Sequence, residues 1–352
     1  MKRALVDLSS VIWTCLLAGK DLEFGVSVEH EGKPVLINSA QYGFENAIHH
    51  LHGMMGDLQL APYQLIFVKE GLNAKALRTH LHPGYKVGRE RHAQQVDQFN
   101  DCQNRVIEAF LDLGAQLCWQ DGGVEADDVL GYLAQHLVGE RWIVSGDKDL
   151  AQCVGMQSQD DQGSIHHWRA GVVDANPFLD FPHALIPVYI ALVGDSADKI
   201  PGAKGFGAKA FIKLLSVFGV EGLHLLRELI QNRQLHRLGE DVAEVRELQK
   251  VIDSAQQVEL SYELGRLHIE RVNTLHRPLQ WRAGMCKRAT SLTHENLSRF
   301  AARTRLVHAG NYAQAVAWAQ ERIARAPYVS LDIETSTPAR SDEWLSQADK
   351  DP

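Results

Sequence analysis

The sequence lacks a hydrophobic run long enough to cross a bilayer, which takes about 20 apolar residues. Its apolar N-terminal stretch is interrupted by Asp7, which the core of a signal peptide would not tolerate. Cysteine is scarce, and no two cysteines have CxxC spacing, so we expect neither a disulfide framework nor a zinc ribbon. The sequence predicts a cytoplasmic chain with no membrane segment and with reduced, mostly buried thiols at Cys15, Cys102, Cys118, Cys153 and Cys286.

Two familiar motifs are also missing. No GxSxG elbow is present, so a serine nucleophile of the hydrolase type is not indicated. The stretch IPGAKGFGAKAF, residues 200–211, resembles a phosphate loop in its spacing of Gly202 and Gly207, but Ala208 stands where a P-loop requires lysine. No strand is expected to lead into this stretch, which argues against a dinucleotide-binding turn as well.

A basic excess is absent too. The net charge is −8 over 352 residues, and as a global average this speaks against a nucleic-acid partner. The acids gather in a few places, however, and the basic residues crowd elsewhere, so the local pattern matters more than the sum. With 45% hydrophobic and 23% charged residues, the chain can bury one large core or two smaller ones.

The pattern of apolar residues predicts an α/β fold followed by helices. Short β-type runs alternate with helical periodicity, which favours a mainly parallel central sheet flanked by helices. From residue 182 onward the pattern is helical with glycine-rich turns, and a basic, irregular stretch at 278–293 suggests a boundary. The expected strands are 3–8, 64–68, 115–119 and 141–145, and the expected helices are 94–113, 125–138, 184–193, 208–218, 220–235 and 242–260.

Acidic residues recur at the ends of the expected strands and the starts of helices. In open α/β sheets, sites lie beyond the carboxyl ends of the strands. Packing so many like charges together would be unfavourable without cations, and hard oxygen ligands suit magnesium or manganese. The alternative is that acids in a first helical turn, as in VEADDVL, only complement the helix dipole. The candidate ligands are Asp7, Glu70, Glu125, Asp127, Asp128, Asp147, Asp149, Asp195 and Asp198.

Two basic segments accompany these acids. Residues 69–91 carry six lysines and arginines with Tyr85 among them, a mixture that suits the gripping of a nucleic-acid strand or a solvated helix face. Residues 200–211 would form a tight turn between helices, either an ordinary hairpin or one that aims N–H groups and Lys199, Lys204 and Lys209 at phosphates. The histidines at 49, 50, 52, 80 and 82 lack partner cysteines, and we expect them at the surface rather than on zinc.

The stretches LVDLSS, YKVGR, VEADDVLGYLA, SGDKDLAQ and LVGDSADKIPGAKGFGAKA resemble, in order, those of the 5′ nuclease or flap endonuclease family, which includes the N-terminal domain of bacterial DNA polymerase I and phage nucleases. The resemblance covers residues 1–290. It implies a PIN-like core at 1–181 with a helical arch around 69–91, and a helix–three-turn–helix subdomain at 182–290. The implied activity is metal-dependent hydrolysis of DNA at 5′ flaps and 5′ ends, as flap endonuclease and 5′–3′ exonuclease.

The same resemblance implies roles for individual residues. Two Mg²⁺ or Mn²⁺ ions would be held, the first by Glu125, Asp127, Asp128 and Asp147 and the second by Asp149, Asp195 and Asp198, with Asp7 completing the cluster through water. Lys86 and Arg89 would contact the scissile phosphate, and Tyr85 the terminal base. Glu70 stands where the family usually has aspartate. The turn with Gly202, Gly205, Gly207 and the three lysines would grip duplex DNA around a potassium ion.

The tail carries a second resemblance. SLDIETS, with Asp332 and Glu334, is similar to the first motif of the 3′–5′ exonuclease domain of family A polymerases. Later motifs of that domain are missing, so we expect residues 291–352 to be an incomplete, inactive start of it, and we expect a monomer with a partner or fused polymerase. Two alternatives stay open, a PIN-type ribonuclease and a catalytically inactive DNA-binding module of a polymerase.

Overall fold

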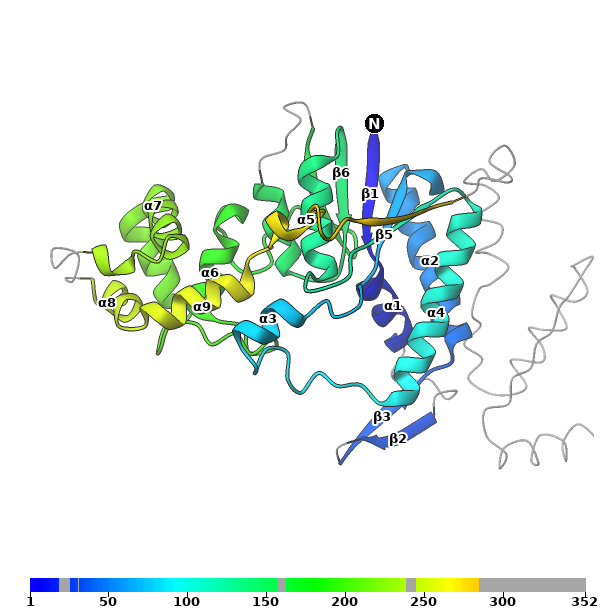
Figure 1. The fold of residues 1–352 in the computed structure, drawn as a ribbon, viewed down its shortest axis with the longest axis horizontal. Coiled ribbons are helices and arrows are strands. Elements are labelled where there is room, and N and C mark those ends of the chain that lie inside the picture. The colour runs from blue at the N-terminus through cyan, green and yellow to red at the C-terminus, as the bar shows by residue number, and fades with distance from the viewer. Residues whose placement is uncertain (19–25, 31, 157–162, 239–244, 285–352) are drawn as a thin grey trace, which may run out of the picture.

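The computed structural model describes residues 1–18, 26–30, 32–156, 163–238 and 245–284 (Figure 1). A seven-stranded sheet of these residues has the order β8-β7-β6-β1-β4-β5-β9. The five inner strands are parallel to one another, and the short edge strands β8 and β9 are antiparallel to their neighbours. The strands are β1 (Lys2–Asp7), β4 (Leu65–Val68), β5 (Gln116–Trp119), β6 (Glu140–Val144), β7 (Ile165–Arg169), β8 (Val172–Val173) and β9 (Gln280–Ala283), and a separate hairpin joins β2 (Val26–His30) to β3 (Lys33–Ile37).

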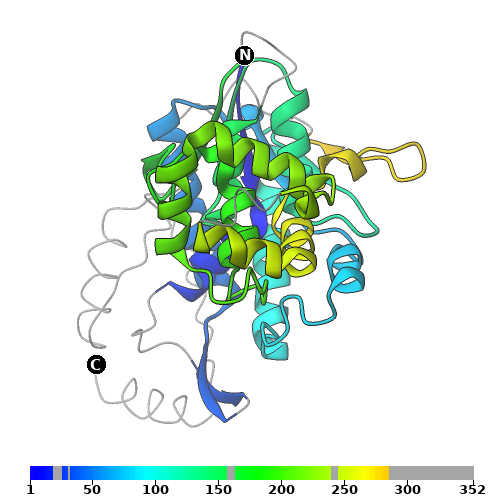
Figure 2. The ribbon, with the colours of Figure 1, turned by 90° about the vertical axis from the view of Figure 1, so that its left-hand side faces the viewer.

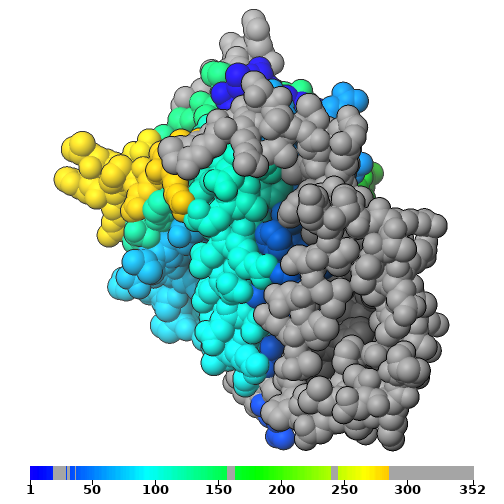
Figure 3. Space-filling model, turned by 90° about the vertical axis from the view of Figure 1, so that its right-hand side faces the viewer, coloured from blue at the N-terminus to red at the C-terminus, as the bar shows by residue number. Residues whose placement is uncertain are grey.

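Helices cover both faces of this sheet. Ala4 and Val6 of β1 belong to the core beneath α1 (Leu8–Leu17), α2 (Ala40–Leu58) and α4 (Ala93–Asp112). Leu5, which points to the other face, packs with the apolar side of α5 (Ala126–His136). Figure 3 shows α4 as a continuous strip on the side of the molecule remote from the helical layer described next. The prediction of a mainly parallel, helix-flanked sheet is confirmed.

The later helices form a layer of their own around a second core, at the left of Figure 1 and toward the viewer in Figure 2. They are α6 (Ile186–Val193), α7 (Ala208–Gln231), α8 (Arg246–Asp253) and α9 (Ala255–Gly265). Gly219, with φ of +67°, divides α7 into two helical segments. This agrees with the prediction of two helices, at 208–218 and 220–235. The single helix expected at 242–260 is wrong, because the chain leaves helical geometry at Ser254. The Ser254 hydroxyl accepts a hydrogen bond from the backbone N–H of Lys204 (3.1 Å), so the break supports the glycine turn.

Several elements are short or were not expected. The segment that follows β4 contains one short helix, α3 (Ala76–Leu81), and β7 was not predicted. The stretch expected to be irregular at 278–293 contains β9, which pairs with β5 of the core sheet although it lies in the range assigned to the helical subdomain. Short 3-10 helices occur at η1 (Pro62–Gln64), η2 (Asp149–Gly155), η3 (His183–Leu185), η4 (Leu235–Arg237) and η6 (Ile269–Arg271).

The remaining expectations can be placed on this fold. Cys15, Cys102, Cys118 and Cys153 are buried and free, as expected. The histidines are less exposed than predicted: His80 is exposed, whereas the other four are half-buried, and His50 packs edge-on against Trp168 (ring centroids 5.5 Å apart). None of the described helices combines the length and apolarity that a bilayer crossing needs. Cys286 and the tail at 291–352, with Asp332 and Glu334, lie outside the described residues.

Candidate metal centre

The candidate carboxylates meet at the carboxyl edge of the sheet. Asp7 is the last residue of β1, Glu70 follows β4, and Asp147 and Asp149 follow β6. Because β4 and β6 flank β1 and run parallel to it, their ends lie side by side at this edge. Asp127 joins them from the first turn of α5.

Ser145 links Asp7 and Asp147 at the centre of this edge through hydrogen bonds. Asp7 is 5% exposed, and its two carboxylate oxygens accept hydrogen bonds from the Ser10 N–H (3.0 Å) and the Ser145 hydroxyl (2.7 Å). The Ser145 hydroxyl oxygen in turn accepts from the Asp147 N–H (3.0 Å). Ser145 was not predicted as a site residue, although its place at the end of an expected strand beside Asp147 was the available signal. Burial raises the pKa of Asp7 to about 6, and repulsion by Asp147 adds to this shift.

The start of α5 adds Glu125 to the cluster and contacts Glu70. Glu125, which is 2% exposed, is the residue before the helix, and Glu70 reaches the first turn, where its Oε2 accepts from the Ala126 N–H (3.3 Å). Glu70 therefore reaches the cluster although it stands where the family usually has the shorter aspartate. Burial raises the pKa of Asp127 well above its usual range, and Asp147 and Asp7 raise it further by repulsion.

A second group of acids lies beside the first. Asp149 opens η2, and Asp195 and Asp198 lie in the turn after α6, where Asp195 accepts from the Ala197 N–H (2.7 Å). Burial and the charge of Asp147 raise the pKa of Asp149 to about 8, and Oδ1 of Asp149 is buried without a hydrogen-bond partner in the described part of the chain. Asp147 thus repels members of both groups.

The basic segment lies on these acids. Lys86 Nζ is 3.1 Å from Glu125 Oε1 and 3.8 Å from Asp198 Oδ2, and its backbone N–H donates to the Asp198 carbonyl (3.0 Å). The Tyr85 hydroxyl donates to Glu125 (2.9 Å), and Arg89 pairs with Asp198. Tyr85 is 6% exposed, so in this arrangement its ring is not open for stacking on a base. Among the described residues, no group of three or more His, Cys, Asp or Glu side chains is already arranged to hold a metal ion.

Asp128 stands apart from the other acids. Its carboxylate is fully buried and accepts four hydrogen bonds: two from the Arg78 guanidinium (2.8 Å each), one from the His268 N–H (2.8 Å) and one from the Glu125 N–H (2.9 Å). The structure therefore does not bring Asp128 to the open edge of the sheet with Asp7, Asp127 and Asp147.

The glycine turn lies between α6 and α7. Gly202 has φ of +67°, and a Cβ there would lie 2.5 Å from the Gly194 nitrogen, so a larger residue does not fit. Gly205 also has a positive φ, of +66°, whereas Gly207 is extended. The side chains of Lys199, Lys204 and Lys209 are exposed, as the expected contact with phosphates requires.

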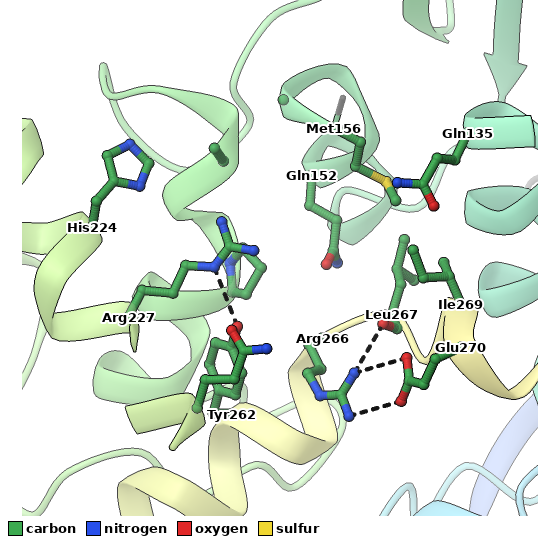
Figure 4. Close-up of a pocket in the computed structure, with 14 residues that line it drawn as sticks. Gln135, Gln152, Met156, His224, Arg227, Tyr262, Arg266, Leu267, Ile269 and Glu270 are labelled. Atoms are coloured by element: carbon green, nitrogen blue, oxygen red, sulfur yellow. Dashed lines mark hydrogen bonds and ion pairs between the residues drawn. The ribbon is translucent and has the colours of Figure 1, made fainter. Parts of the chain in front are cut away.

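A cavity in the described part of the chain lies away from these acids. It has a volume of about 760 Å³ and opens between η2, α7 and α9, with Gln152, Arg227, Tyr262 and Arg266 on its walls (Figure 4). None of the carboxylates at the sheet edge lines it. Gln152 connects the two places, because its side-chain amide donates to the Asp149 carbonyl (2.9 Å).

A family model for the 5′–3′ exonuclease N-terminal resolvase-like domain matches residues 5–172, and the chain belongs to this family of 5′ nucleases. Flap endonuclease Xni of Yersinia enterocolitica is 32% identical over 188 residues, which are 48% of this chain and 73% of that protein. The thermostable DNA polymerase I of Thermus thermophilus is 29% identical over 246 residues, 68% of this chain. The chain spans only 26% of that polymerase.

The fold is also that of a solved nuclease. The T5 D15 protein, co-crystallised with metal ions, superposes with a TM-score of 0.50 at 15% identity, over 86% of this chain and 98% of the other. This likeness supports the PIN-like arrangement of sheet and helices.

Proposed function

We propose that the chain is a divalent-metal-dependent 5′ nuclease that hydrolyses DNA phosphodiesters at 5′ flaps and free 5′ ends. One observation carries this proposal. Lys86, Arg89 and Lys148 contact carboxylates at the rim of the cluster, but within the described residues no cation lies within 4.0 Å of the carboxylates at its centre. These central acids are Asp7, Asp127, Asp147 and Asp149. Asp7 is buried and the other three are half-buried. Clustered acids that repel one another and have no cation in direct contact fit a site for divalent cations.

Each of the two groups of acids would bind one divalent ion, Mg²⁺ or Mn²⁺. Glu125, Asp127 and Asp147 would hold the first, and Asp149, Asp195 and Asp198 the second, with Asp7 and Glu70 completing the cluster. Bound ions supply a hydroxide nucleophile near neutral pH and charge for an in-line displacement at phosphorus.

The chain's own cations would bind the substrate. Lys86 and Arg89 already lie within reach of Glu125 and Asp198, so in the proposed complex they can turn from these carboxylates to the scissile phosphate. The Ser145 hydroxyl keeps Asp7 and the backbone of Asp147 in register at the sheet edge.

The glycine turn would hold the duplex part of the DNA. Lys199, Lys204 and Lys209 are exposed on it, and a potassium ion at the turn is part of the proposal. The name of the Yersinia relative, flap endonuclease Xni, favours branched DNA. We further propose that the chain acts as a monomer in the cytoplasm, alone or with a fused or partner polymerase of the kind found in the Thermus relative.

The test is cleavage of 5′-labelled flap, nicked and single-stranded DNA with Mg²⁺, with Mn²⁺ and with chelator, beside an RNA strand of the same sequence. We expect metal-dependent release of short 5′ products from DNA and none from the Asp147→Asn variant. Cleavage of RNA alone would favour a PIN-type ribonuclease, and binding without cleavage would indicate an inactive DNA-binding module.

A further inference from the structure

Asp127 and Asp128 are adjacent in the sequence but have opposite surroundings. No cation contacts Asp127 within the described residues, whereas every face of the Asp128 carboxylate is occupied. A carboxylate has about four lone-pair sites. The four donors of Asp128 fill them, and its side chain has no exposed surface.

The donors of Asp128 come from three different parts of the chain. Arg78 belongs to α3 in the basic segment, Glu125 directly precedes α5, and His268 follows α9. Asp128 therefore joins the basic segment and the helical layer to the helix that carries Glu125 and Asp127.

Arg78 completes this junction. It is 3% exposed, and its guanidinium also donates to the carbonyls of Leu264 (3.1 Å) and Arg266 (2.9 Å) at the end of α9. A further contact joins its Nη1 to Glu125 Oε2 (3.0 Å). Lysine could not replace these contacts, since it lacks the planar fork.

We propose that Asp128 is not a metal ligand and that the Arg78–Asp128 pair is a positioning device that fixes Tyr85 and Lys86 opposite Glu125. Arg78 lies seven and eight residues before these two side chains, and both of them contact the carboxylate that Arg78 also contacts. Loosening the pair would let the basic segment move relative to the acids. This inference rests on the proposed function, because it assumes that ions bind at the neighbouring carboxylates.

The experiment compares Asp128→Asn with Asp147→Asn, a matched change at a proposed ligand. Mn²⁺ binding is measured by calorimetry without DNA, and thermal unfolding is measured in chelator. We expect Asp128→Asn to lower the metal-free Tm by about 6–12 °C, because Arg78 loses its buried partner, while Mn²⁺ affinity changes by less than about threefold. Asp147→Asn should leave the metal-free Tm unchanged or raised and lower Mn²⁺ affinity by about tenfold or more.

The opposite pattern overturns the proposal: an unchanged metal-free Tm in Asp128→Asn together with a loss of Mn²⁺ affinity as large as in Asp147→Asn. If Asp147→Asn also kept full Mn²⁺ affinity, the proposed metal centre would be refuted. A lowered Tm of Asp128→Asn would still support the role of Asp128 in the fold. If Asp128→Asn does not fold, the Arg78→Lys variant tests the positioning role instead. We expect it to lower the metal-free Tm and kcat with KM and Mn²⁺ affinity nearly unchanged, and wild-type values of Tm and kcat would refute the positioning role.

Discussion

His167 gives the sharpest prediction for the stability of the sheet that carries the site. It is 2% exposed on β7, and its Nε2 is buried without a partner among the described residues. It pairs with Ile143 near the end of β6, and Ser145 follows that strand. Burial lowers the pKa of His167 from 6.5 to about 4. The folded protein therefore keeps this imidazole neutral at pH values where the unfolded chain protonates it.

The sign of the effect follows from this difference. Above pH 6.5 neither state holds the proton, and the contribution of His167 to stability does not change with pH. As the pH falls from 6.5 toward 4, the unfolded state binds a proton that the folded state does not, so stability is lost across this window. The shift corresponds to about 3 kcal/mol, since one pKa unit is about 1.4 kcal/mol.

The assay is denaturant unfolding at pH 7, 6, 5 and 4 in chelator, for the wild type and for His167→Phe, which keeps a ring but cannot titrate. The carboxylates titrate in the same window in both proteins, so the difference between the two curves isolates His167. We expect the variant to gain about 3 kcal/mol relative to the wild type between pH 7 and 4. Parallel curves would refute the claim that His167 is neutral and desolvated in the fold.

Three further predictions concern the site. Lys86→Ala should lower single-turnover cleavage by about 100-fold while changing flap-DNA affinity in Ca²⁺ little, and equal losses in both would indicate a simple backbone contact. Lys204→Ala and Lys209→Ala should each weaken the binding of duplex DNA of any sequence, and each should lower the slope of log affinity against log salt concentration by about one. Lys213→Ala is the control and should change neither, since Lys213 pairs with Glu247 (2.7 Å). Mn²⁺ at about 100 times its Kd should stabilise the protein by about 2.7 kcal/mol in unfolding assays, and no shift would argue against the centre.

The sequence was sufficient to predict the strands that carry the acids. Short β-type runs ended at Asp7, before Glu70 and before Asp147, and parallel strands bring such ends to one edge. It was insufficient for β9, because a four-residue edge strand whose residues are all exposed has no periodic apolar pattern to reveal it. Its place is set by pairing with β5, a contact across more than 150 residues.

The basic segment shows a different limit of sequence reasoning. Its composition indicated contact with phosphates, but the same charges attract the carboxylates of the protein itself. In the structure Lys86 and Arg89 lie on Glu125 and Asp198, and the positive φ of Lys86 (+55°) turns the chain toward the acids. Attraction between segments far apart in sequence depends on the fold and leaves no local pattern.

Asp127 and Asp128 show why a motif alone does not assign roles. Successive residues of a helix point about 100° apart, so the side chains of Asp127 and Asp128 leave the helix in different directions. Asp128 lies three residues after Glu125 and accepts from its N–H (2.9 Å), which is the geometry of a capping box. The simpler interpretation of VEADDVL, acids that complete a helix start, thus fits Asp128, while Asp127 keeps its proposed role as a cation ligand. Arg78 distinguishes the two acids, because its buried guanidinium pairs with Asp128, whereas the counter-charge of Asp127 would come from the proposed ions.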